Sequence, residues 1–101
     1  MLRKDLDDLV ENGQLGDWCF MEFPERLVLF LRYPVTSEDW VKFYQEVPEL
    51  NRGDVVSLPI SGEKQPVWHW DGNREAPTLT PSVNVIGRWH GWLRKGKLET
   101  A

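Results

Sequence analysis

The sequence has little cysteine, little histidine and no long apolar run. Its 101 residues include one cysteine, Cys19, and two histidines. A single thiol excludes an intramolecular disulfide and any zinc site built mainly from cysteines. The longest apolar run, Leu27 to Leu31, is too short to cross a bilayer or to form the core of a secretory signal. We therefore expect a soluble, cytoplasmic protein with no export signal and no membrane partner.

The composition that remains is that of one globular domain. Hydrophobic residues make up 41% of the chain and charged residues 28%, and we expect a single domain over residues 1–101. Residues 1–63 hold 13 acidic and 6 basic residues, whereas residues 64–101 hold 3 acidic and 6 basic ones. The basic C-terminal part favours an anionic ligand, although an uneven surface charge without a function is the alternative. The isoelectric point near 5.1 argues against nucleic acid as a partner.

Apolar periodicity and turn residues predict an α+β fold with a small antiparallel β-sheet and one or two short helices. We expect the sheet to form a sandwich or a partly open barrel. Asn51–Asp54 is predicted to be a turn, and Ser61–Gln65 a polar loop. The predicted helices cover residues 2–11 and 36–46, and the predicted strands cover 18–23, 26–33, 55–60, 67–70, 82–86, 89–93 and 97–100. The last two strands are expected to pair with each other.

No nucleophile is evident in the sequence. Cys19 lies in an apolar stretch, where a buried, inert thiol is the ordinary role. The serines and threonines show no G-x-S-x-G elbow or other familiar nucleophile context. The sequence therefore predicts no catalytic residue, and we expect no enzymatic activity.

A metal site is an alternative because His69, Asp71 and His90 supply imidazole and carboxylate ligands. His69 and Asp71 would share one face of a strand, and His90 would join them only from a neighbouring strand. Their spacing fits no compact metal motif, and hydrogen-bonded surface histidines are the simpler interpretation. We expect neither a metal nor a cofactor.

Tryptophan is the most unusual component, with four of the six tryptophans between residues 68 and 92. Indole faces stack on planar rings, arginines pair with phosphates, and hydroxyl, imidazole and carboxylate groups bind ring edges. Core packing is the alternative for any single tryptophan, and no phosphate-binding glycine loop is present. The predicted ligand-binding residues are Trp68, His69, Trp70, Asp71, Arg74, Thr78, Thr80, Ser82, Arg88, Trp89, His90 and Trp92.

Two segments of this region carry a family resemblance. Trp68–Asn73, continued by Pro77–Ser82, and Gly87–Leu93 contain the ordered motifs W-x-W-D-G-N, P-T-L-T-P-S and W-H-G-x-L. They resemble a family of small phage and bacterial proteins of unknown function, whose members are often labelled ammonia monooxygenase. The resemblance covers about the last third of the chain and implies a phage setting, and hence the cytoplasm of an infected host cell.

Together these features predict a phage-encoded, non-enzymatic binding protein that sequesters a small anionic ligand. The expected ligand is a nucleotide-type immune signal, such as a cyclic nucleotide or an ADP-ribose derivative, so that the protein acts as an anti-defence sponge. One alternative is an inhibitor of a host or defence protein that binds through its tryptophan-rich surface. A metal-dependent hydrolase is the other. We also expect a homo-oligomer.

Overall fold

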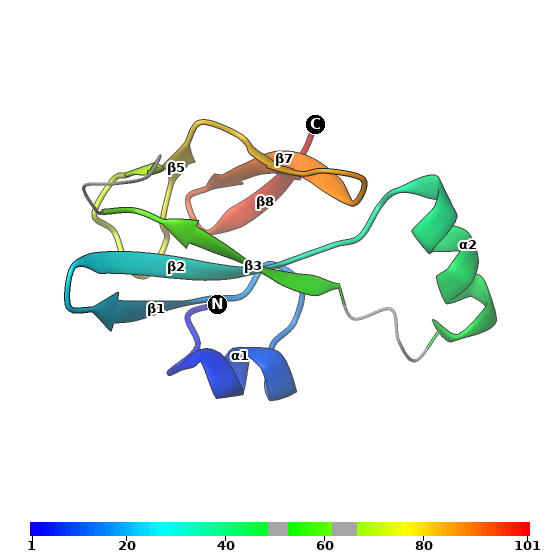
Figure 1. Cartoon of the computed structure of the whole chain (residues 1–101), viewed down its shortest axis with the longest axis horizontal. Coiled ribbons are helices and arrows are strands. Elements are labelled where there is room, and N and C mark those ends of the chain that lie inside the picture. The colour runs from blue at the N-terminus through cyan, green and yellow to red at the C-terminus, as the bar shows by residue number, and fades with distance from the viewer. Residues whose placement is uncertain (49–52, 62–66) are drawn as a thin grey trace.

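The computed structural model describes residues 1–48, 53–61 and 67–101 and has the predicted α+β architecture (Figure 1). In this part of the chain, two helices accompany three small antiparallel sheets, which stay open and do not close into a barrel. Most of the turn and the loop predicted at 51–54 and 61–65 lies outside the described residues. Neither helix is long and apolar enough to cross a membrane.

The N-terminal half builds the largest sheet. Its strands β1 (Trp18–Phe23), β2 (Arg26–Tyr33) and β3 (Asp54–Pro59) pair in that order. The predicted bounds of β1 and β2 are confirmed, and β3 begins one residue earlier than predicted. Aliphatic and aromatic residues fill β2, which lies in the centre and is covered on both faces over much of its length. This sheet is the platform on which the rest of the chain packs.

The first helix is shorter than its apolar spacing predicts. Helix α1 covers Leu6–Asn12, whereas residues 2–11 were predicted. The helix begins late because the Asp5 carboxylate accepts a hydrogen bond from the Asp8 N–H at 2.8 Å, which caps the first turn. Leu2 instead forms a bridge to Trp18 of β1. The predicted start of the helix is therefore wrong, and its predicted end is one residue too early.

The C-terminal half forms two further small sheets. Strands β4 (His69–Trp70) and β5 (Leu79–Thr80) make one, and β6 (Val83–Val85), β7 (Trp89–Arg94) and β8 (Lys97–Thr100) make the other. The predicted pairing of the last two strands is confirmed. Lys95 and Gly96 at their tip both have positive φ, as a tight hairpin turn requires. The strands at 67–70 and 82–86 are shorter than predicted.

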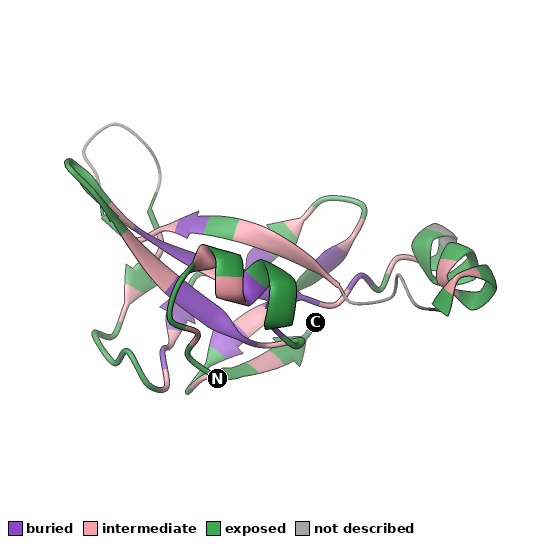
Figure 2. Cartoon of the chain, turned by 90° about the horizontal axis from the view of Figure 1, so that it is seen from below, coloured by how far each residue is buried: buried purple, intermediate pink, exposed green. Residues whose placement is uncertain are grey.

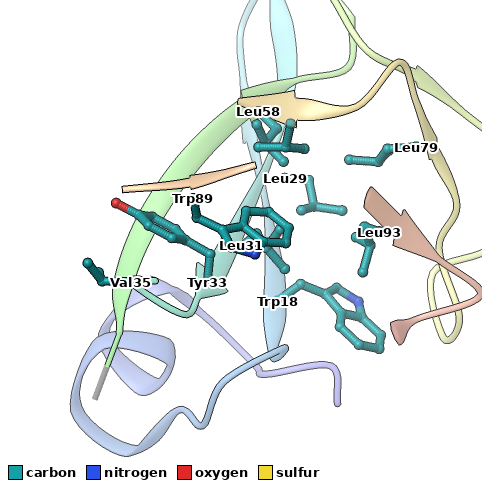
Figure 3. Close-up of a cluster of buried hydrophobic side chains, with 10 residues drawn as sticks. Trp18, Leu29, Leu31, Tyr33, Val35, Leu58, Leu79, Trp89 and Leu93 are labelled. Carbon is teal, nitrogen blue, oxygen red and sulfur yellow. The ribbon is translucent and has the colours of Figure 1, made fainter. Parts of the chain in front are cut away.

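The core lies between the β1–β2–β3 sheet and the β6–β7–β8 sheet (Figure 3). Two tryptophans are buried in it, and each has a partner for its indole N–H. Trp18 donates to the carbonyl oxygen of Arg74 at 3.0 Å, and Trp89 donates to the Thr100 hydroxyl at 3.0 Å. The buried cluster consists of Trp18, Leu29, Leu31, Tyr33, Val35, Leu58, Leu79, Val83, Trp89 and Leu93.

The second helix, α2 (Glu38–Glu46), confirms the predicted helix except for its first two residues, and it projects from the body of the molecule (Figure 1). Figure 2 shows only exposed and intermediate residues among those of the helix whose burial is described, Glu38 and 40–46. The chain before α2 is fixed to the body because the N–H groups of Thr36 and Ser37 donate to the Arg88 carbonyl oxygen, at 2.9 and 3.2 Å.

Candidate functional site

Ser82 and His90 meet on the outer face of the β6–β7–β8 sheet. Ser82 immediately precedes β6, and His90 is the second residue of β7. The Ser82 Oγ lies 3.0 Å from the His90 Nε2. When the imidazole carries its proton on Nδ1, the hydroxyl donates to Nε2, which is the arrangement of a serine nucleophile and its general base. We call this pair the Ser82–His90 dyad.

The register of the β6–β7 hairpin creates the dyad. Asn84 pairs with His90 and Val83 with Gly91, so Ser82 is the diagonal neighbour of His90 on the same face. The alternate residues of these strands, including Val83 and Trp89, point into the core. Burial of the apolar set therefore fixes the serine and the histidine on the opposite face.

Gly91 permits the sheet to pack closely beneath the dyad. It lies between His90 and Trp92 and is buried. A Cβ at this position would lie well inside 3.0 Å of both the Glu99 carbonyl oxygen and the Trp89 ring. Only glycine fits here without moving β8 or the core indole.

Two half-buried indoles flank the dyad. The Trp92 ring lies 5.8 Å from the His90 ring, centroid to centroid, at an interplanar angle of 36°. The Trp68 Nε1–H donates to the Ser82 carbonyl oxygen at 3.4 Å, and the Trp68 ring packs against the core cluster. Ser82 is half-buried and His90 is exposed, so the dyad faces outward.

The imidazole has one hydrogen-bonding partner, Ser82, within residues 1–48, 53–61 and 67–101. No carboxylate in these ranges binds its second nitrogen, so the described part of the site is a dyad and not a triad. The same ranges contain no group of three or more histidine, cysteine, aspartate or glutamate side chains able to hold a metal ion. The chemistry available is that of a hydroxyl and an imidazole.

No familiar motif in the sequence indicated that Ser82 would meet a histidine. Ser82 and His90 were both predicted to bind a ligand, but the structure joins them as a hydrogen-bonded pair. The predicted strands at 82–86 and 89–93 leave only residues 87 and 88 between them, and a hairpin with that loop would place Ser82 and His90 on opposite faces. In the structure β6 ends at Val85, so the loop has three residues, 86–88, and Ser82 becomes the diagonal neighbour of His90.

Asp71 and Thr78, two of the predicted ligand-binding residues, hold the loop between β4 and β5. The Asp71 carboxylate accepts hydrogen bonds from the N–H groups of Asn73, at 3.0 Å, and Thr78, at 3.3 Å. The Thr78 hydroxyl accepts a hydrogen bond from the Lys95 N–H at 2.9 Å. These contacts attach the loop to the tip of the β7–β8 hairpin.

Arg74 and Trp70 lie together against β1. The Arg74 guanidinium carbon lies 4.8 Å from the centre of the Phe20 ring and 5.9 Å from that of Trp70, and the group pairs with Glu22 at 3.6 Å. The Trp70 Nε1–H donates to the carbonyl oxygen of Asn73 at 3.2 Å. No contact joins this group to the dyad in the described residues.

Arg88 connects the β6–β7 turn to α2. Its guanidinium forms an ion pair with Asp54 and lies 5.2 Å from the centre of the Trp40 ring. Its hydrogen bond with Tyr33 raises the pKa of the Arg88 guanidinium, and the nearby Asp54 charge acts in the same direction. Arg88 is therefore already paired with a carboxylate of its own chain, that of Asp54.

The remaining predicted residues divide between the core and the surface. The Trp89 side chain is 3% exposed and packs in the core. His69 and Thr80 are exposed and face each other as a cross-strand pair of β4 and β5. Cys19 is buried as expected, and burial raises the pKa of its thiol to about 11. Of the twelve predicted residues, the structure brings together Trp68, Ser82, His90 and Trp92.

Comparison with known proteins identifies one matching family. A family model described as bacterial ubiquitination-like system serine protease (BubE) matches residues 50–101, just over half of the chain. The matched segment contains the whole dyad and both flanking indoles. No curated protein and no solved structure matches the chain.

This match overturns the function predicted from the sequence. A non-enzymatic, phage-encoded sponge for a nucleotide signal is wrong, because the matching family is one of serine proteases. The match equally gives no support to an inhibitor that acts through its tryptophans or to a metal-dependent hydrolase. The resemblance to small phage proteins, and the expectation of a homo-oligomer, stay predictions.

Proposed function

Because this chain belongs to the BubE family of bacterial ubiquitination-like system serine proteases, we propose that it is a serine hydrolase that cleaves an acyl bond in a protein substrate of such a system. The observation that carries the proposal is the 3.0 Å separation of Ser82 Oγ and His90 Nε2. This distance lies within the range for direct proton transfer between a nucleophile and its base.

The first half of the reaction follows from the roles of the two side chains. Ser82 Oγ attacks the carbonyl carbon of the scissile bond while its proton moves to His90 Nε2. The tetrahedral intermediate then breaks its bond to the leaving nitrogen, which takes the proton from the imidazolium. The amine product departs, and the acyl group remains on Ser82 as an ester.

The second half returns the enzyme to its starting state. A water molecule gives a proton to His90 as its oxygen attacks the ester carbonyl. The bond from the acyl carbon to Ser82 Oγ breaks, Ser82 takes the proton back, and the product leaves with a new carboxyl group.

The outward-facing position of the dyad favours a macromolecular substrate. His90 is exposed and Ser82 is half-buried, so a bound protein segment would supply the cover that excludes water. The half-buried indoles of Trp68 and Trp92 offer apolar contact on either side. We place the reaction in the cytoplasm, with which the free thiol of Cys19 is compatible.

An active-site serine probe tests the proposal without knowledge of the substrate. Incubation with a fluorophosphonate, followed by intact mass and peptide mapping, should show one adduct, on Ser82. Ser82→Ala should remove the adduct and His90→Ala should slow its formation by at least about 100-fold, the range for loss of a general base. Ser57→Ala, which changes an exposed serine on β3, is the matched control and should label like the parent. Absence of the Ser82 adduct from the folded parent refutes the proposal.

A further inference from the structure

The nucleophile has little backbone support of its own. Ser82 lies outside the regular strands, between the end of β5 at Thr80 and the start of β6 at Val83. The ladder with β7 begins only at Val83. A serine at such a position needs another contact to fix the direction of its Oγ toward the base.

Trp68 provides this contact. Its indole Nε1–H donates to the carbonyl oxygen of Ser82 at 3.4 Å, and its ring packs against the core cluster. Its backbone N–H donates to the Pro59 carbonyl oxygen, at the end of β3, at 2.9 Å. Trp68 is therefore anchored to β3 through its backbone, while its indole N–H holds the peptide group of Ser82.

We propose, on the basis of the function proposed above, that Trp68 is a positioning residue for the Ser82 nucleophile. Its N–H fixes the Ser82 peptide group, which sets the direction of Oγ toward His90 Nε2. Trp68 does not touch the imidazole, so it affects how often the hydroxyl points correctly and not whether the base is protonated.

The test separates the indole N–H from the bulk of the ring. Trp68→Phe removes the donor and keeps an aromatic side chain. Trp70→Phe is the matched control, because it removes an indole N–H that donates to Asn73 at 3.2 Å, remote from the dyad. For each variant, the probe concentration dependence of Ser82 labelling gives the maximal rate and the half-saturating concentration, and thermal unfolding gives the stability.

We expect Trp68→Phe to lower the maximal labelling rate by at least about fivefold, the effect of losing one neutral hydrogen bond. The half-saturating probe concentration and the shape of the pH dependence of Ser82 labelling should match those of the parent protein. Trp70→Phe should stay within about twofold of the parent in rate. A residue that only stabilised the fold would change thermal unfolding and leave these rates alone.

If Trp68→Phe is folded and labels Ser82 at the maximal rate of the parent protein, Trp68 is not a positioning residue. If this variant does not fold, 3-benzothienylalanine at position 68 keeps the shape of the indole and replaces its N–H with sulfur, and the same criterion applies to it. Failure of the parent protein to label at Ser82 would instead count against the proposed function, so the two failures are distinguishable.

Discussion

Replacing Gly91 with alanine is expected to destabilise the protein and to impair the dyad together. The new methyl group would overlap the carbonyl oxygen of Glu99 on β8 and the ring of Trp89 in the core. The carbonyl belongs to the strand that pairs with Gly91 through Thr100, so it cannot move without opening the β7–β8 ladder. The Trp89 ring is held by its bond to Thr100.

The magnitude follows from two opposing effects. Inserting a methyl group into a packed site costs about 1–3 kcal/mol, and the smaller backbone entropy of the unfolded alanine variant returns at most about 1 kcal/mol. The obstacles at Gly91 are a backbone atom and a buried ring, so we expect a cost at the upper end, about 3 kcal/mol, and after the entropic return a net loss of about 2 kcal/mol. For a domain of about 100 residues this corresponds to a fall in melting temperature of about 8–16 °C.

Thermal unfolding and probe labelling measure the two effects. Gly72→Ala is the control: its φ of 86° makes alanine costly, but no atom lies within 4 Å of the added Cβ. Both variants should be less stable than the parent, but at a temperature where both are folded only Gly91→Ala should label slowly at Ser82. A melting temperature for Gly91→Ala within about 4 °C of the parent would refute the packing argument.

Three further outcomes follow from the contacts described above. Burial by itself raises the pKa of Asp17, but hydrogen bonds from the Gln14 N–H and from Arg3 outweigh it and lower the pKa below its usual value. Ionised Asp17 therefore stabilises the folded protein at neutral pH, and this stabilisation is lost as the pH falls below about 4. In urea unfolding, Asp17→Asn should be less stable than the parent by about 1–3 kcal/mol at pH 7 and closer to the parent in acid. Iodoacetamide should modify Cys19 only in denaturant, because the thiol is buried and its pKa is about 11; modification of the native protein at the rate of free cysteine would contradict this. Arg88→Ala should have little effect on stability and leave Ser82 labelling unchanged, since the guanidinium is partly exposed and pairs with Asp54 and not with the dyad; a large loss of labelling would place Arg88 in the site.

Local sequence signals predicted the local structure well. Runs of aromatic and aliphatic residues with prolines at their ends gave the bounds of β1 and β2, and the lysine–glycine tip gave the β7–β8 hairpin. The error in the first helix arose because a side-chain hydrogen bond, and not apolar spacing, sets where the helix begins. The Asp5 cap delays α1, which apolar spacing alone placed four residues earlier.

The positions of the predicted ligand-binding residues in the fold depend on contacts between residues that are far apart in the sequence. Arg74 and Arg88 were predicted to pair with a bound anion, whereas the fold brings Glu22 and Asp54 to them from distant positions in the sequence. A composition count cannot detect such pairing, because it shows which charges exist and not which of them already have partners. Six tryptophans likewise suggested a large binding surface, although two of them, Trp18 and Trp89, are core residues.

The dyad itself illustrates why a serine–histidine pair can be absent from every local motif. Familiar motifs mark serines whose immediate neighbours build the turn that exposes them. Here the serine lies at the beginning of one strand and its base near the beginning of the next, eight residues later, and their contact depends on the register of the hairpin. A one-residue change of register would transfer one strand's side chains to the opposite face and bring a valine or a tryptophan outward. Burial of Val83, Trp89 and Leu93 prevents that change, so the same apolar residues that stabilise the fold also hold Ser82 against His90.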